Sequence, residues 1–346
     1  MMRGRIPWLL IAAALGALVA YVSIQWLFSP AVPTSDFARP IQPTIIEVPE
    51  GMTLRQLAAR LEREQLIRSQ MAFLLLGKLM AADRHIKAGE YAVHAGMRPS
   101  EMLTEFLNGH VVLYQVTIPE GYTVVELAQV FAQQGLADPE ALIGLAHDRD
   151  FIQSLAIEAA SLEGYLFPNT YKFARRTKPK EIVKEMVEGL WHVFTPELRQ
   201  RAQEIHMTPH QVLTLASVIE KETGSAEERE LISAVFHNRL RLGIPLQSDP
   251  TVIYGLDYFD GNLRKKDLDS KSPYNTYRVR GLPPGPIANP GLGALRAALY
   301  PAPTKHLYFV SRNDGTHQFS STLAEHNRAV DKYQRHRVVK AVRPSA

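Results

Sequence analysis

One helix with a carboxyl group beside its apolar face is the stretch best suited to chemistry. The helix is predicted between Thr208, a good N-cap, and Gly224, which stops it, with Pro209 in the first helical position. Apolar side chains recur along one stripe at helical spacing: Val212, Leu215, Ala216 and Ile219. Glu220 lies at the margin of that stripe. Partial burial there would raise the pKa of its carboxyl group, as a general acid working near neutral pH requires.

Two interpretations of Glu220 stay open from its position alone. A glutamate at the edge of an apolar face is usually a solvated boundary residue without a chemical role. Glu222 lies on the other margin of the same stripe, so it replaces Glu220 if the helical register differs. For a reaction that needs two carboxylates, Glu163 and Asp249 are the candidates for the second one.

Polar and aromatic residues that could hold a ligand follow this helix in two loops. The first contains the turn signal Asp249-Pro250, and the second, 271–290, is dense in Pro, Gly, Tyr, Asn and Thr. A long surface loop in a compact domain is more often functional than idle. The candidate ligand-binding residues are Gln247, Ser248, Asp249, Tyr254, Tyr274, Asn275, Thr276 and Tyr277, with His317 as a further candidate. Each could equally stabilise its own turn.

Composition and motif content disfavour several other kinds of site. The sequence has no cysteine, which excludes disulfides, cysteine zinc sites and a thiol nucleophile. It contains neither H-E-x-x-H nor G-x-S-x-G, which disfavours a metalloprotease and a serine hydrolase. We therefore expect no metal and no cofactor. A formal net charge of +4 over 346 residues is small and does not indicate nucleic-acid binding.

The start of the chain predicts a membrane anchor. Residues 1–5 are short and basic, and the run 6–28 contains no charged residue. As a helix this run is about 34 Å long, enough to cross a hydrocarbon core of about 30 Å. The preceding positive charges predict a cytoplasmic N-terminus and the rest of the chain outside. The alternative is a cleaved signal peptide, which the length of the run and the lack of an A-x-A site disfavour.

An internal repeat follows a proline-rich linker at 29–43. From Ile46 and again from Val116 the chain shows a β-rich run, a turn with glycine, a threonine helix cap and an amphipathic helix. The matching residues are Pro49-Glu50-Gly51 with Pro119-Glu120-Gly121, Thr53 with Thr123, and Leu57-Ala58 with Leu127-Ala128. A degenerate third copy lies between them. Such units resemble LysM modules, which bind glycans containing N-acetylglucosamine; the alternative is a unit that serves packing alone.

Several stretches together resemble the membrane-anchored endolytic murein transglycosylases, also called the YceG-like family. They are LEGYLFPNTYKF, LASVIEKET, HNRL, LQSDPTVIYGL, SPYNTYRVRGLPPGPIANPG and YFVSRNDGTHQFSSTLAEHN, spread over about residues 46–328. The resemblance implies a lyase of the inner membrane and periplasm that cuts nascent peptidoglycan strands internally. The family's catalytic glutamate lies in the LASxxEKE segment, which carries over to Glu220. Asn169 stands where the family often has aspartate, so no carboxylate is expected there.

The chemistry that this resemblance implies needs only one carboxyl group. Glu220 would protonate the glycosidic oxygen between N-acetylmuramic acid and N-acetylglucosamine, then accept the proton of the muramyl 6-hydroxyl as it closes onto C1. The product is a 1,6-anhydro end, and strand elongation terminates. The implied partners are peptidoglycan strands, the inner membrane, peptidoglycan synthases and division proteins. Two alternatives stay open: a muramidase that uses water, with Asp249 or Glu163 as second carboxylate, and a non-catalytic glycan-binding scaffold of the cell-wall synthesis machinery.

The whole chain is accordingly expected to be α+β, with an N-terminal transmembrane helix. The expected parts are a cytoplasmic tail at 1–5, a transmembrane anchor at 6–28, a linker at 29–43, a LysM-like module at 44–115, a second repeat unit and connector at 116–160, a mixed α+β catalytic domain at 161–334 and a basic tail at 335–346.

Overall fold

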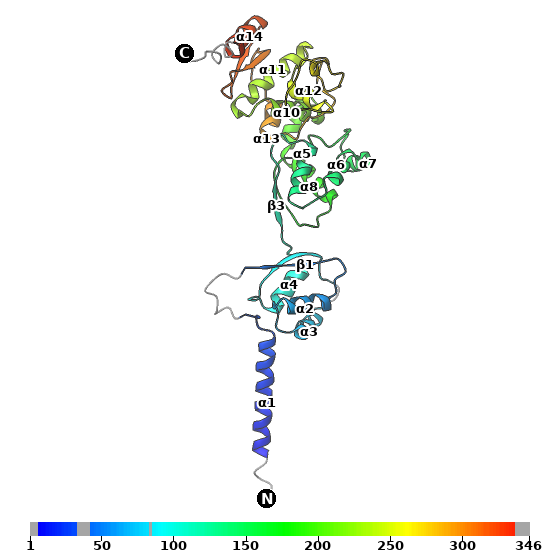
Figure 1. Ribbon diagram of the computed structural model, residues 1–346, viewed down its shortest axis with the longest axis vertical. Coiled ribbons are helices and arrows are strands. Elements are labelled where there is room, and N and C mark those ends of the chain that lie inside the picture. The colour runs from blue at the N-terminus through cyan, green and yellow to red at the C-terminus, as the bar shows by residue number, and fades with distance from the viewer. Residues whose placement is uncertain (1–5, 33–41, 83–84, 336–346) are drawn as a thin grey trace, which may run out of the picture. The chain divides into compact units, whose positions relative to one another are not determined.

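The computed structural model describes residues 6–32, 42–82 and 85–335 (Figure 1). Two compact units divide the chain: the first contains residues of Met1–Tyr114 and Lys172–Arg176, and the second those of Gln115–Tyr171 and Thr177–Ala346. The expected cytoplasmic tail, most of the linker and residues 336–346 of the basic tail lie outside the described residues. Helices and strands are both present, as the α+β expectation requires.

Helix α1 (Ile6–Leu27) coincides with the apolar run found in the sequence. Its residues 10–27 are apolar enough and long enough to cross a membrane, and none of them is buried against the rest of the protein. A signal sequence near the N-terminus would satisfy the same criteria of length and composition.

The first unit contains a strand–helix–helix–strand arrangement. It comprises β1 (Thr44–Val48), α2 (Leu54–Arg63), α3 (Gln70–Leu79) and β2 (Gly89–Val93), followed by α4 (Pro99–Asn108). β1 and β2 are antiparallel, with Thr44 opposite Val93 and Val48 opposite Gly89. One face of this two-stranded sheet packs with the three helices, and the core contains Ile46, Leu57, Phe73, Tyr91 and Phe106. The order of elements is compatible with the LysM resemblance, which stays a hypothesis.

Both copies of the predicted repeat unit are present. Thr53 caps α2 by accepting a hydrogen bond from the backbone N–H of Gln56. In the second copy, which begins within β3 (Tyr114–Thr117), Thr123 caps α5 (Val124–Gln133) in the same way, through the N–H of Glu126. The preceding glycines, Gly51 and Gly121, have positive φ values of 80° and 77°, which explains why the turn uses glycine in both copies.

The second unit is mainly helical. Its further elements are α6 (Pro139–His147), α7 (Arg149–Ser154), α8 (Pro179–Val193), α9 (Pro196–Glu204), α10 (Pro209–Glu222), α11 (Arg229–Leu242), α12 (Asp249–Tyr254), α13 (Leu292–Leu299), β5 (Tyr308–Ser311), β6 (His317–Ser320) and α14 (Leu323–Val330). Single turns at Ala226–Glu228 and Asp267–Asp269 and a π-helical turn at Asp331–Arg335 complete it. Strand β4 (Thr170–Phe173) has residues in both units. Strands β3 and β4 pair with each other. Residues 116–160, which the sequence sets apart as a connector, belong to this second unit.

Helix α10 is the central helix of the second unit. It contacts α9, α11, α12 and α13 (Figure 1). Thr208 caps it and Pro209 opens it, as predicted, and it ends at Glu222 with Thr223 as its C-cap, directly before the predicted stop at Gly224. The prediction of one buried stripe is wrong, because every side chain from Val212 to Ile219 is buried.

Two polar residues explain why the pattern of apolar residues did not predict burial on all sides of α10. The hydroxyl of Thr214 donates to the carbonyl of His210 at 2.7 Å. The hydroxyl of Ser217 donates to the carbonyl of Thr214 at 2.7 Å and accepts from the N–H of Ile287 at 3.0 Å. Because these hydroxyls are satisfied inside the protein, they can lie in the core.

The loop 271–290 is only partly a surface loop, which corrects the expectation. Its last residues are buried, including Ile287, Ala288 and Asn289. The N–H of Asn289 donates to the carbonyl of Tyr122 at 2.8 Å, and the N–H of Gly121 donates to the carbonyl of Asn289 at 2.9 Å. This pairing satisfies the backbone of a segment that would otherwise have to remain in water.

A hairpin near the C-terminal end packs on α11. β5 and β6 are antiparallel, with Ser311 opposite His317, and enclose the turn predicted at Asp314-Gly315. The ring of Phe309 meets that of Phe236 at a centroid distance of 6.0 Å. The hairpin therefore lies against the helix that begins at Arg229.

Removing either threonine cap should destabilise the unit that contains it, by a similar amount in each case. Replacing Thr53 or Thr123 by alanine should lower the free energy of unfolding by about 1 kcal/mol, because an N-terminal N–H of the helix loses its acceptor. Hydrogen exchange measured in denaturant should place the loss in the first unit for Thr53→Ala and in the second for Thr123→Ala. Equal loss in both units for either variant would contradict this assignment.

Candidate active site around Glu220

Glu220 lies in the last turn of α10 with its carboxyl group turned into the protein. Its side chain is only 6% exposed. One carboxyl oxygen accepts the backbone N–H of Gly291 at 2.9 Å, and the other accepts Nη2 of Arg229 at 3.3 Å. The margin position inferred from the sequence is thus a nearly buried one, and the interpretation of Glu220 as a solvated boundary residue is not supported.

Arg229 lies between two carboxylates. Its Nη2 is also 3.6 Å from the carboxyl group of Glu120, in the Pro-Glu-Gly turn before α5. Within the described residues its Nε is buried and forms no hydrogen bond. An arginine that spans two acidic groups couples their charges, so the state of Glu120 affects Glu220 through Arg229 as well as directly.

Opposing effects set the pKa of Glu220, and burial is the largest of them. Burial raises the pKa above its usual value, the Gly291 N–H and the Arg229 cation lower it, and the negative charge of Glu120 raises it. The balance is a raised pKa. The carboxyl group is therefore better able to hold a proton toward neutral pH, while two donors are in place to stabilise the anion once that proton leaves.

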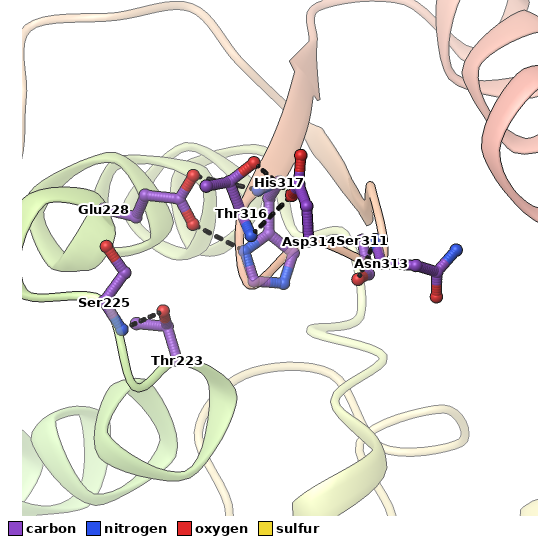
Figure 2. Close-up of polar contacts among 8 residues, drawn as sticks. All are labelled: Thr223, Ser225, Glu228, Ser311, Asn313, Asp314, Thr316 and His317. Atoms are coloured by element: carbon purple, nitrogen blue, oxygen red, sulfur yellow. Dashed lines mark hydrogen bonds and ion pairs between the residues drawn. The ribbon is translucent and has the colours of Figure 1, made fainter.

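Glu228, the residue directly before Arg229, is hydrogen-bonded to His317 at the start of β6 (Figure 2). The backbone N–H of His317 donates to one carboxyl oxygen of Glu228 at 2.8 Å, and Nδ1 lies 2.6 Å from the other. Nearby, the hydroxyl oxygen of Thr223 accepts the N–H of Ser225 at 2.9 Å. His317, a sugar-binding candidate from sequence, thus contacts Glu228, the residue next to Arg229.

Glu163 forms a second buried carboxyl centre. Its oxygens accept the N–H of Val124 at 3.1 and 3.2 Å, at the N-terminus of α5. The side-chain amide of Asn289 donates to it at 3.2 Å, and the hydroxyl of Tyr254 at 3.4 Å. Burial raises the pKa of Glu163 to about 7, although the hydrogen bonds from Val124 and Tyr254 oppose the shift. Asn289 therefore contacts Glu163 and stands two residues before Gly291, whose N–H binds Glu220.

The carboxyl group of Glu222 is the third buried acidic group, and it contacts a different set of residues. The hydroxyl of Ser248 donates to this carboxyl group, and burial raises its pKa to about 7, with Asp249 adding to the rise. The hydroxyl of Tyr277 donates to Asp249 at 2.6 Å. A side-chain amide oxygen of Gln247 accepts from Arg239 at 3.2 Å.

Most of the ligand-binding candidates thus gather around Glu222, while Glu220 takes its partners from Gly291 and Arg229. Tyr254 lies apart, at Glu163, with its ring 4.9 Å from that of Tyr274. Asn275 and Thr276 are buried: the Asn275 amide donates to two loop carbonyls, and Thr276 binds the backbone of Ser248. Asn275 thus stabilises its own loop, the alternative that the sequence had left open, whereas Thr276 joins this loop to Ser248 and Thr251 at the start of α12.

The prominent cavities of the second unit lie elsewhere. One of about 600 Å³ is lined by His210, Gln211 and Thr214 on α10, with Pro283 and Pro284. Another, of about 430 Å³, shares His210. Both are at the N-terminal half of α10, whereas Glu220 is in its last turn, so the candidate site rests on the surroundings of the carboxyl group and not on cavity size.

Comparisons with known proteins decide the family. Residues 46–332 match the YceG-like family. The chain belongs to this family. An endolytic murein transglycosylase of Bacillus subtilis (strain 168) is 34% identical over 304 residues, which cover 83% of this chain and 84% of that protein. The endolytic murein transglycosylase of Streptococcus pneumoniae serotype 2 is 29% identical over 94% of this chain, which spans 64% of that longer protein.

A solved structure supports the fold of this YceG-like protein. The crystal structure of a yceG-like protein from Listeria monocytogenes has a TM-score of 0.58 and 33% sequence identity to this chain. The match covers 83% of this chain and 98% of the Listeria chain. The family resemblance drawn from the sequence motifs is confirmed.

Four residues of the site were not found from the sequence. They are Glu120, Arg229, Asn289 and Gly291. Glu120 was seen only as part of the repeat, and it is exposed like its counterpart Glu50. The Asn-Pro pair at 289–290 was the one local sign that this part of the loop has a fixed conformation.

Two substitutions should move the pKa of Glu220 in opposite directions. Arg229→Met removes a cation that lowers the pKa and should raise it further. Glu120→Gln removes an anion that raises the pKa and should lower it. Carbon-detected NMR titration of the Glu220 carboxyl group measures both shifts. Shifts of the same sign in the two variants would contradict the shared-arginine arrangement.

Glu163 should make stability depend on pH. Its pKa is raised from 4.5 to about 7, so its contribution is fully present below about pH 4.5 and is lost as pH rises through about 7. Glu163→Gln removes that dependence. Relative to the wild type, the variant should gain up to about 3 kcal/mol of unfolding free energy between pH 4.5 and pH 8.

Urea denaturation at several pH values tests this prediction, with Glu140→Gln, a change at an exposed glutamate of the same unit, as control. A difference between Glu163→Gln and wild type that stays constant with pH would show that folding does not shift the pKa of Glu163.

Proposed function

We propose that this protein is a membrane-anchored endolytic lytic transglycosylase that cleaves nascent peptidoglycan strands, with Glu220 as acid and then base. The observation that carries the proposal is the nearly buried carboxyl group of Glu220, with a raised pKa and two donors from Gly291 and Arg229. Membership of the YceG-like family and the endolytic murein transglycosylases among its relatives support the substrate and the reaction.

In the first step, the protonated Glu220 donates its proton to the glycosidic oxygen between N-acetylmuramic acid and N-acetylglucosamine. The bond from C1 to that oxygen breaks, the N-acetylglucosamine side leaves as an alcohol, and positive charge develops at C1. The carboxylate left behind is stabilised by the Gly291 N–H and by Arg229, so the donors act where negative charge forms.

In the second step, the muramyl 6-hydroxyl attacks C1 and its proton passes to the Glu220 carboxylate. A 1,6-anhydro end results, the enzyme regains its starting protonation state, and no water is consumed. One group can act as acid and then as base only if its pKa lies between the two tasks. The opposition between burial and the Arg229 cation provides that balance.

A water-using muramidase is the second candidate, favoured by the number of carboxyl groups near α10. Glu163 and Asp249 were the candidates for a second carboxylate, and Glu222 lies beside Asp249. Against it, Glu163 and Asp249 are already engaged, the first by the N-terminus of α5 and the second by Tyr277. The one-carboxylate reaction needs neither to be released.

We further propose that α1 is retained as a single-pass anchor in the inner membrane, with a cytoplasmic N-terminus and both units in the periplasm. The first unit is proposed to be a LysM-like module that contacts glycan, which its strand–helix–helix–strand order supports. Gln247, Ser248, Asp249, Tyr254 and Tyr277 are proposed to hold the sugar, while Asn275 and Thr276 act by shaping the loop. Synthases and division proteins are the proposed protein partners.

Paired substitutions on one helix test the catalytic assignment. Glu220→Gln should fold normally and lose about 10²- to 10⁴-fold in the rate of strand cleavage, the usual contribution of a general acid or base. Glu222→Gln is the matched control, since it makes the same change two residues away and should be far milder. Release of soluble fragments from uncrosslinked glycan strands, followed by chromatography, measures the rates.

Retained cleavage in Glu220→Gln would exclude Glu220 as the acid. A greater loss in Glu222→Gln than in Glu220→Gln would transfer the role to Glu222 and its partner Ser248. Wild-type protein without any cleavage, when its anchor is intact, would favour the glycan-binding scaffold.

A further inference from the structure

Helix α3 is apolar on two opposite faces. Ala72, Phe73 and Gly77 are buried in the core of the first unit. On the other side Met71, Leu75 and Leu79 are 75%, 54% and 76% exposed. These three residues are spaced four apart and therefore form one stripe along the helix, which we call the outer face of α3. Within the first unit nothing among the described residues covers it.

Basic side chains flank the outer face, and the carboxyl group of Glu62 accepts the N–H of Gln70 at 2.9 Å at the start of the helix. Lys78 lies on the same side of the helix, and with Arg55 of α2 it lines a hollow of about 600 Å³ that also includes Met71 and Leu75. From residue 65 to residue 82 the sequence contains no acidic residue, and its charged residues are Arg68 and Lys78. An apolar stripe with basic flanks is the pattern of a helix that lies in a lipid surface.

The outer face begins close to the end of α1. The guanidinium group of Arg68 lies 4.6 Å from the ring centre of Trp26, in the last turn of α1. The Nε of the same arginine donates to the carbonyl of Pro30 at 2.9 Å. Arg68 precedes Met71 by three residues, so the end of the apolar helix and the start of α3 meet through one side chain. Trp26 is a residue type that favours the membrane interface.

We infer that the outer face of α3 rests on the surface of the lipid bilayer, on the side where α1 emerges, and prefers anionic lipids. This inference rests on the proposed role of α1 as an anchor. The three apolar side chains enter the boundary between headgroups and acyl chains, while Lys78 and Arg55 lie among the phosphates. The first unit is then held against the membrane by a second contact besides α1.

The absence of cysteine from the sequence makes a site-specific test direct. Full-length Leu75→Cys protein is labelled with an environment-sensitive fluorophore and reconstituted in phosphatidylethanolamine–phosphatidylglycerol vesicles containing doxyl-labelled lipid. Leu113→Cys is the matched control, because Leu113 is also a leucine of the first unit and is likewise 54% exposed. Met71→Cys and Leu79→Cys serve as second reporters in case one label disturbs the helix.

The label at residue 75 should shift its emission to shorter wavelength and be quenched by the doxyl lipid, while the label at 113 should remain aqueous. Replacing phosphatidylglycerol with phosphatidylcholine, or introducing Lys78→Glu, should reduce the shift. Vesicle flotation reports on the anchor separately. Protein that floats with all α3 labels in water overturns the inference but leaves the anchor, and protein that does not float overturns both. Labels shielded only in native membranes, and not in pure lipid, would indicate a protein partner and also overturn it.

Discussion

The hydrogen bond from the Gly291 N–H to Glu220 is the contact on which the rest of the site depends. It exists because residues 287–291 run buried beside α10, with Asn289 paired to Gly121 and Tyr122 and with Ile287 bound to Ser217. The same pairing positions Glu120, which shares Arg229 with Glu220. A carboxyl group, its donors and its opposing charge are thus set by a segment that is otherwise an irregular loop.

Arg229 opposes the effect of burial on the pKa of Glu220. A buried glutamate without a cation would hold its proton too firmly to act as a base, and one with a close, unshared arginine would release it too early to act as an acid. Sharing the guanidinium group with Glu120 weakens its hold on Glu220. Glu228 stands immediately before Arg229 and is hydrogen-bonded to His317. The segment that carries Arg229 is thereby attached to the β5–β6 hairpin, which is distant from α10 in the sequence.

Local features of the fold could be predicted from the sequence, and long-range ones could not. The caps at Thr53, Thr123 and Thr208 were predictable because each acts on its own helix through a residue three positions away. The burial of α10 on all sides was missed because Thr214 and Ser217 look polar until their partners are known. Glu220 was located by periodicity and motif, whereas Arg229, Asn289 and Gly291 reach the site through tertiary contacts that no spacing reveals.

The central claim is that cleavage proceeds without water, and isotopic labelling of the products tests it most directly. The full-length protein acts on uncrosslinked glycan strands in water enriched in heavy oxygen, and mass spectrometry reads the newly formed muramic acid ends. The account predicts 1,6-anhydro ends without heavy oxygen, because the 6-hydroxyl of the substrate attacks C1. Reducing ends that carry heavy oxygen would contradict it and assign the reaction to a muramidase with a second carboxylate.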